Sequence, residues 1–179
     1  MGRDKAALTL EGETLLAIAV EILRPLVRNI FVVGGPDRYP ETQNLQDLIP
    51  DAGPLSGILT ALCASTSELL LVRAVDLPLI ATSTLQDLIA ASKGADITMI
   101  RTPDGRKHPL CAVYSKRCIE PARKSLILGL RRVEHLLEYN TLSVRILNSE
   151  EIGGIPEEFT NINTPEDMEK ARKLLSGRT

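Results

Sequence analysis

One acidic residue follows a long apolar run, at a position where α/β proteins carry out chemistry. Residues 69–75 are typical of a buried strand, and Asp76 comes next in the sequence DLP. A single carboxylate at the end of a strand suits Mg²⁺, which keeps several waters and takes other oxygen ligands from substrate phosphates. Asp76 could instead cap the next helix, although Thr82 and Ser83 are available for that role.

Two further stretches combine small or amide residues with a turn. In PDAGPLSG, Gly53 permits a tight turn, Pro54 starts a helix and Gly57 leaves room on its first turns. In FTNINTPED, alternation places the amides of Asn161 and Asn163 on one face, ahead of a helix. Each stretch can position a phosphate, and each also fits an ordinary turn or cap.

Charged and ionisable residues complete the set of candidates. Lys5 lies in a charged opening loop, and Asp47 can accept hydrogen bonds from a donor-rich base edge. His108 precedes a proline, which forces an extended backbone and predicts an imidazole projecting from a loop edge, either for acid–base work or simply exposed. Arg131 and Arg132 start an expected helix, where positive charge favours a bound anion or a salt bridge.

The elements that must position these residues alternate between helix and strand. Their order predicts a single α/β domain over residues 1–179, with three layers and with ligands beyond the carboxyl ends of the strands. The predicted helices are 14–26, 55–64, 82–92, 116–126, 131–139 and 164–175, and the predicted strands are 30–33, 45–49, 68–75, 96–101, 110–114 and 142–147. A short strand at 8–10, a turn at 11–13 and a helix cap at Thr14 are also expected.

The composition excludes several classes of function. The net charge of −2 gives no electrostatic reason to expect a nucleic acid or a membrane as partner. No apolar run approaches the length of a membrane span, and no secretory leader is recognisable. The cysteines are Cys63, Cys111 and Cys118, an odd number without metal-type spacing, so we expect free thiols, a cytoplasmic location and no zinc site.

Six motifs together resemble a known family, the molybdenum cofactor guanylyltransferases, over essentially the whole chain. They are MGRDKAALTLEGETLL, DAGPLSGILTAL, AVDLP, HPLCAVY, GLRRVEHLLE and FTNINTPEDMEKA. The pair HPL and NINTPED is the most specific part, whereas DLP and GPLSG also fit sister nucleotidyltransferases. The resemblance implies a three-layer α/β/α sandwich with a Rossmann-like, mostly parallel sheet of the nucleotide-diphospho-sugar transferase type.

The family pattern also has a strand and an LAGG loop ahead of its MG-x-DK element. This chain starts at the methionine of that element. The resemblance therefore leads us to expect that the first strand of the sheet is missing, with Met1 an internal methionine of a longer chain. A shortened, inactive relative is the alternative.

The resemblance implies transfer of GMP from GTP to the terminal phosphate of molybdopterin, which releases pyrophosphate and forms molybdopterin guanine dinucleotide. Lys5 would hold the nucleotide phosphates, Asp76 would hold Mg²⁺, and Asp47 with the backbone of Gly53 would bind guanine. The cofactor expected is Mg²⁺, and the expected partners are GTP, molybdopterin and possible acceptor molybdo- or tungstoenzymes.

The remaining candidates are assigned by the resemblance to the reacting and acceptor sides of the site. Asn161 and Asn163 would lie near the α-phosphate and the incoming phosphate, and His108, Arg131 and Arg132 would face the pterin. Two alternatives stay open. One is a sister transferase with another base or acceptor, such as a cytidylyltransferase for the same cofactor, and the other is a non-catalytic nucleotide-binding regulator.

Overall fold

The amino end of the chain forms a hairpin that leads directly into a capped helix. A computed structural model describes residues 5–35 and 39–176. After the short helix η1 (Lys5–Ala7), β1 (Thr9–Leu10) and β2 (Glu13–Thr14) pair across a turn in which Glu11 and Gly12 have positive φ, as tight hairpins favour. Thr14 then caps α1 (Leu15–Leu23), accepting from the Ala17 N–H at 3.1 Å. The predicted strand, turn and Thr14 cap are confirmed, whereas the second strand of the hairpin, β2, was not predicted.

The other elements follow the predicted alternation, and three of them differ most from the prediction. The predicted strand 45–49 is wrong, since the strand ends at Leu45; the strand expected at 110–114 begins earlier, at Lys107; and the helix expected at 131–139 is a 3₁₀ helix. In order they are β3 (Phe31–Val33), β4 (Gln43–Leu45), α2 (Pro54–Ala64), β5 (Leu69–Arg73), α3 (Thr82–Ala91), β6 (Ile97–Arg101), β7 (Lys107–Ser115), η2 (Lys116–Cys118), α4 (Ile119–Ile127), η3 (Val133–Glu138), β8 (Val144–Asn148), η4 (Ser149–Ile152), η5 (Pro156–Phe159) and α5 (Pro165–Ser176).

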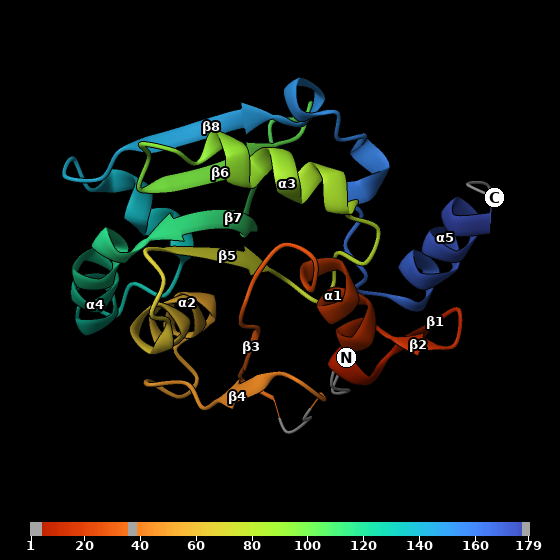
Figure 1. The fold of residues 1–179 in the computed structure, drawn as a ribbon, viewed down its shortest axis with the longest axis horizontal. Helices are drawn as coiled ribbons and strands as arrows, with labels where there is room; N and C mark the ends of the chain where they lie inside the picture. The colour runs from red at the N-terminus through yellow and green to blue at the C-terminus, as the bar shows by residue number, and fades with distance from the viewer. Residues whose placement is uncertain (1–4, 36–38, 177–179) are drawn as a thin grey trace.

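The main sheet has four strands in the order β5-β7-β6-β8 (Figure 1). Its pairing is mixed, because β7 runs antiparallel to both neighbours while β6 and β8 are parallel. The β6–β7 register shifts between Met99 and Ile100, which face Ala112 and His108 respectively. This irregularity leaves Pro109 out of the ladder, where a residue without an N–H is tolerated.

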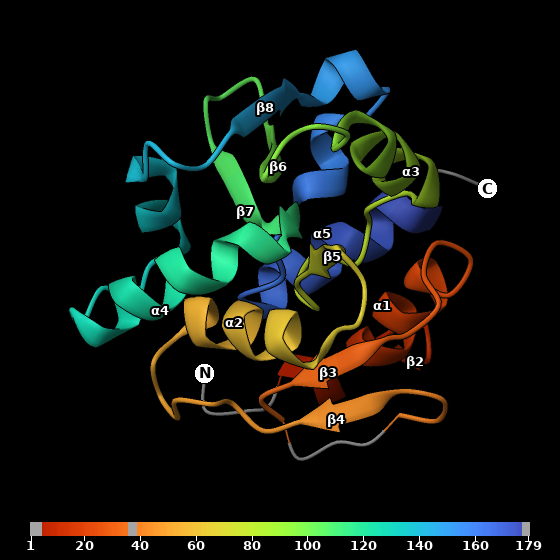
Figure 2. The ribbon, with the colours of Figure 1, turned by 60° about the vertical axis from the view of Figure 1, so that its left-hand side comes forward.

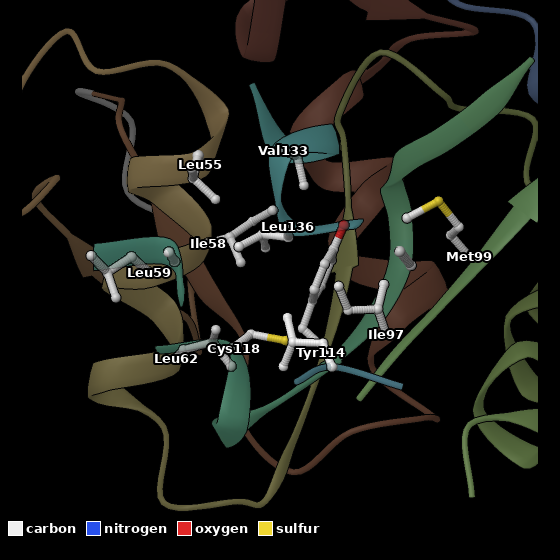
Figure 3. Close-up of a cluster of buried hydrophobic side chains, with 13 residues drawn as sticks. Leu55, Ile58, Leu59, Leu62, Ile97, Met99, Tyr114, Cys118, Val133 and Leu136 are labelled. Carbon is white, nitrogen blue, oxygen red and sulfur yellow. The ribbon is translucent and has the colours of Figure 1, made fainter. Parts of the chain in front are cut away.

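Helices cover both faces of this sheet, which confirms the three-layer architecture. On one face, α2, α4 and η3 pack on Tyr114 and Met99; on the other, α3 and the end of α1 pack on Val113 and Ile100 (Figure 2). The side chains of successive strand residues therefore point to opposite faces of the sheet and pack against different helical layers. Figure 3 shows the first of these clusters, in which the Tyr114 side chain is fully buried and its hydroxyl donates to the Pro109 carbonyl at 2.7 Å.

The strands β3 and β4 form a separate parallel pair beside α2. Among the described residues no strand lies between β3 and β5, as the resemblance led us to expect, and a cavity of about 620 Å³ occupies this region. Its lining is mostly apolar and includes Val20, Val32 and Leu71. Arg73 also lines it, and its Nε and Nη1 are buried with no hydrogen-bond partner in the described part of the chain.

One buried carboxylate ties together three strands of the main sheet. Asp96, just before β6, accepts hydrogen bonds from the backbone and hydroxyl of Ser143 ahead of β8 and from the hydroxyl of Ser115 at the end of β7. Burial alone would raise the pKa of Asp96, but these hydrogen bonds and the charge of Arg117 hold it below its ordinary value. The ionised carboxylate is therefore a structural link between the strand ends.

The three cysteines lie in different environments. Cys63 is exposed while Cys111 and Cys118 are buried, and all three are free thiols. The described residues contain no cluster of three or more His, Cys, Asp or Glu side chains arranged to hold a metal. They also include no helix with the length and apolar character needed to cross a membrane.

Candidate active site

Three side chains from distant parts of the sequence meet at the end of β5. Lys5 Nζ lies 3.2 Å from Asp76 Oδ2 and 2.6 Å from Asn163 Oδ1. The Lys5 side chain is 40% exposed and that of Asp76 is 20% exposed, so the ion pair opens to solvent at one side. A cation, a carboxylate and an amide within hydrogen-bonding distance form an arrangement that can bind phosphate and a divalent ion.

The backbone fixes two of these residues relative to each other. The Asp76 carbonyl accepts a hydrogen bond from the Ile162 N–H at 2.8 Å, and the Ile162 side chain is buried. Thr164 caps α5 by accepting from the Asp167 N–H, and Asp167 in turn accepts from the N–H groups of Asn163 and Thr164. These hydrogen bonds keep the pKa of Asp167 below its ordinary value. Asn163 is thus held between a buried anchor and a capped helix.

A second candidate site is formed by the carboxylate of Asp47, which lies close to Gly34 and Gly57. A Cβ on Gly34 would come within 3.0 Å of Asp47 Oδ2, and one on Gly57 would come within 3.7 Å of Oδ1. Gly34 also has a φ of +73°, so it meets both demands that favour glycine. The Oδ1 atom is buried and has no hydrogen-bond partner among the described residues. A buried acceptor without a donor is costly, and a ligand N–H can satisfy it.

The turn ahead of α2 is held by Arg131. Gly53 is the N-cap of this helix with a φ of +74°, and Arg131 Nη1 donates to the Asp51 carbonyl at 2.9 Å. Arg131 therefore contacts the turn that contains Gly53. Arg132, directly before η3, is exposed.

The expectation that His108 projects from a loop edge is wrong. His108 lies in β7, is 5% exposed, contacts Thr102 Oγ1 through Nε2 at 3.1 Å and packs on the ring of Phe159. Burial, together with the charge of Arg106, lowers the pKa of His108 to about 4. The proline that suggested a loop instead lies in the irregular part of the β6–β7 pairing.

The structure thus brings some of the predicted residues together and leaves others apart. Lys5, Asp76 and Asn163 are in direct contact, whereas Asn161 precedes Ile162 with its side chain only partly buried. Gly34 was not among the candidates predicted from the sequence. It could have been noticed because it directly follows the apolar run 30–33.

A three-layer α/β fold with a lysine, a carboxylate and an amide beyond the end of a strand defines an α/β protein whose site lies at the carboxyl edge of its sheet. The chain belongs to the family described as MobA-like NTP transferase domain, whose sequence profile matches residues 1–144. It is thereby an enzyme of the nucleotidyltransferase type.

Relatives with known names agree with this family. The chain is 32% identical to a probable molybdenum cofactor guanylyltransferase of Carboxydothermus hydrogenoformans, over 98% of this chain and 90% of that one. It is also 32% identical to the probable enzyme of the same name from Pelotomaculum thermopropionicum, over 97% and 86%. The crystal structure of molybdopterin-guanine dinucleotide biosynthesis protein A from Archaeoglobus fulgidus superposes with a TM-score of 0.81 at 25% identity, covering 98% of this chain and 92% of that one.

Proposed function

We propose that the protein transfers GMP from GTP to the terminal phosphate of molybdopterin. The observation that carries this proposal is the contact of Lys5 with both Asp76 and Asn163 at the end of β5. The names of the relatives supply the substrates, and the cluster supplies groups suited to phosphoryl chemistry.

The residues of the cluster fit a magnesium ion. Among the described residues, Lys5 supplies the one hydrogen bond to the Asp76 carboxylate, whose side chain remains partly exposed. Mg²⁺ is commonly held by one or two carboxylates plus waters and substrate phosphates, so Asp76 would suffice on the protein side. When bound, the ion would offset phosphate charge as pyrophosphate leaves.

The protein groups bind and orient the reactants. The Lys5 ammonium binds the triphosphate, and the Asn163 side chain holds that ammonium while its amide NH₂ is available to a phosphate oxygen. The acceptor phosphate attacks the α-phosphorus of GTP, a new P–O bond forms, and the bond to the bridging oxygen of pyrophosphate breaks. Positioning and charge complementarity are sufficient for such a step, since no covalent protein nucleophile is required.

Guanine specificity is assigned to Asp47. No described residue donates to its buried Oδ1. Guanine presents two donors on one edge, whereas adenine does not match a double acceptor there. Asn161 belongs to the same segment as Asn163, two residues earlier, and is proposed to face the reacting phosphates. The exposed Arg131 and Arg132 are proposed to attract the anionic pterin, while the buried His108 offers no exposed group for it.

The proposal is tested by incubating the protein with molybdopterin, Mg²⁺ and GTP, CTP or ATP, and quantifying pyrophosphate and the dinucleotide. We expect product with GTP, loss of product with EDTA, and a fall of more than about tenfold in Asp76→Ala, since a lost charge contact costs over about 1.4 kcal/mol. Asp87→Ala, an exposed aspartate on α3, is the matched control. Product with CTP alone would identify a cytidylyltransferase, and nucleotide binding without any product would identify a non-catalytic regulator.

A further inference from the structure

The two segments that hold Asp76 and Asn163 are connected at two points. At one point the Ile162 N–H donates to the Asp76 carbonyl at 2.8 Å. At the other, Glu158 Oε2 accepts from the Ala81 N–H at 3.2 Å. Because residue 76 contacts 162 and residue 81 contacts 158, the segments 76–81 and 158–162 run in opposite directions beside each other.

Glu158 is unusual for a glutamate because it is only 5% exposed. Its neighbours in the two segments are apolar and buried as well, including Ile80, Phe159 and Ile162. Among the described residues no cation forms an ion pair with it. Burying a carboxylate in such surroundings is costly unless hydrogen bonds and a favourable field compensate.

The start of α3 supplies that compensation. The N-cap residue is Ala81, whose side chain cannot cap, so neither Thr82 nor Ser83 takes the position that the sequence suggested. Glu158 accepts instead from the Ala81 N–H and, at 2.7 Å, from the hydroxyl of Thr84. A negative charge at a helix N-terminus is favourable. The carboxylate therefore completes α3 from a segment more than seventy residues away in the sequence.

We propose that Glu158 is a positioning residue of the active site, holding the segment of Asp76 against the segment of Asn163. Without the contact at Ala81, the two segments would keep their apolar packing and the hydrogen bond from Ile162 to Asp76, but they would lose the polar link at their other end, and the distance between carboxylate and amide would vary more. Only the kinetic part of this inference rests on the proposed function.

Amide hydrogen exchange separates positioning from a simple capping role. The Leu85 N–H donates to the Ala81 carbonyl and reports on the first turn of α3, whereas the Ile162 N–H reports on the junction with Asp76. In Glu158→Ala, well below the melting temperature, we expect exchange to accelerate about tenfold or more at both amides. The exposed neighbour Glu157→Gln is the matched control and should leave both unchanged.

A kinetic measurement adds a readout that a purely structural role would not move. In Glu158→Ala we expect kcat to fall and the Mg²⁺ concentration for half-maximal activity to rise, with a smaller change in the KM for GTP. Glu158→Gln, which keeps an acceptor oxygen for Thr84, should recover part of both effects. If Glu158→Ala fails to fold, the same exchange and kinetic measurements are made on Glu158→Gln and Thr84→Val. Each of these variants weakens the contact of Glu158 with α3 without removing it, so smaller changes in the same directions are expected.

Faster exchange at Leu85 with unchanged exchange at Ile162 would overturn the inference, because Glu158 would then be a helix cap only. Unchanged exchange at both amides would overturn it too. If the wild-type protein transfers no nucleotide, the proposed function fails, and the exchange at Ile162 still decides the role of Glu158.

Discussion

The ammonium of Lys5 lies 2.6 Å from the amide oxygen of Asn163, although 158 positions separate the two residues in the sequence. Lys5 precedes the first hairpin and Asn163 precedes the last helix, so the contact closes the site between the two ends of the described chain. The hydrophobic cluster beneath it, with Leu10, Leu15 and Met168, fixes the elements on both sides.

This contact predicts a loss of activity with little loss of stability. In Lys5→Met, kcat/KM should fall about tenfold to a hundredfold, since a hydrogen bond to a charged group contributes roughly 1.5–3 kcal/mol. The melting temperature should change little, because partly exposed ion pairs contribute only about 0–1 kcal/mol to folding. Steady-state kinetics and calorimetry check both parts, with the exposed Lys93→Met as control. An unchanged kcat/KM would remove Lys5 from the site.

Asp47→Asn should relax the choice of base. The amide keeps an acceptor oxygen but loses the charge that strengthens hydrogen bonds to two donors, so discrimination of GTP against ATP should fall by about tenfold. Competition between GTP, ITP and ATP measures this ratio. Asp51→Asn, on an exposed residue of the neighbouring turn, is the control. If the ratio stays at the wild-type value, guanine is recognised by other groups, such as the backbone at Gly53.

His108 predicts a pH dependence of stability. Its pKa in the folded protein is about 4, below the ordinary 6.5, so the folded state disfavours the protonated form. The associated stability is complete above pH 6.5 and is lost as the pH falls toward 4, by up to about 3 kcal/mol.

Urea unfolding between pH 7.5 and 4.5 tests this expectation. The loss should disappear in His108→Gln and persist in His135→Gln, which changes the other histidine of the chain. The aspartates with lowered pKa, such as Asp104, lose their contribution only below about pH 4 and therefore stay outside the window. A wild-type profile that is flat from pH 6.5 to 4.5 would contradict a buried neutral imidazole.

Arg73→Met should stabilise the 179-residue chain. Burial lowers the pKa of the Arg73 guanidinium to about 10. Two of its nitrogens find no acceptor among residues 5–35 and 39–176, while the third donates to the Leu77 carbonyl. Replacing a poorly compensated buried charge by an apolar side chain can stabilise by about 1–4 kcal/mol. Chemical unfolding of this variant beside the exposed Arg123→Met gives the comparison. A lower stability of Arg73→Met would mean that the bond to Leu77 outweighs the cost of burial.

The parts of the fold that the sequence predicts are those in which local pattern and packing agree. The apolar run before Asp76 is a strand in the structure, and Thr14 caps the helix that it was expected to start. His108 was misplaced because Pro109 normally marks the end of a strand, whereas here a shift in register accommodates it. The sequence around Pro109 does not reveal how β7 will pair with β6, and the shift in register depends on that pairing.

The candidate site was predictable as a set of residues but not as a set of contacts. Asp76 could be located from its place after β5, yet its junction with Ile162 depends on how the last loop returns to the sheet. Glu157 and Glu158 are chemically identical in the sequence, and only the packing of η5 decides that one is exposed and the other is buried. The periodicity of apolar residues along the sequence does not show which side chain is buried by a distant segment.

The link through Asp96 also has a consequence for synthesis on the ribosome. Asp96 and its partner Ser143 are 47 residues apart, and β8, at the edge of the sheet, pairs only with β6 among the described strands. At roughly 5–20 residues per second, the edge of β6 that pairs with β8 stays unpaired for about 2–10 s, until β8 has been translated. We expect nascent chains that stop before residue 144 to be cleaved by protease within β6, and chains that extend beyond residue 148 to resist. Equal protease resistance of the two nascent chains would show that β6 is protected before its neighbour arrives.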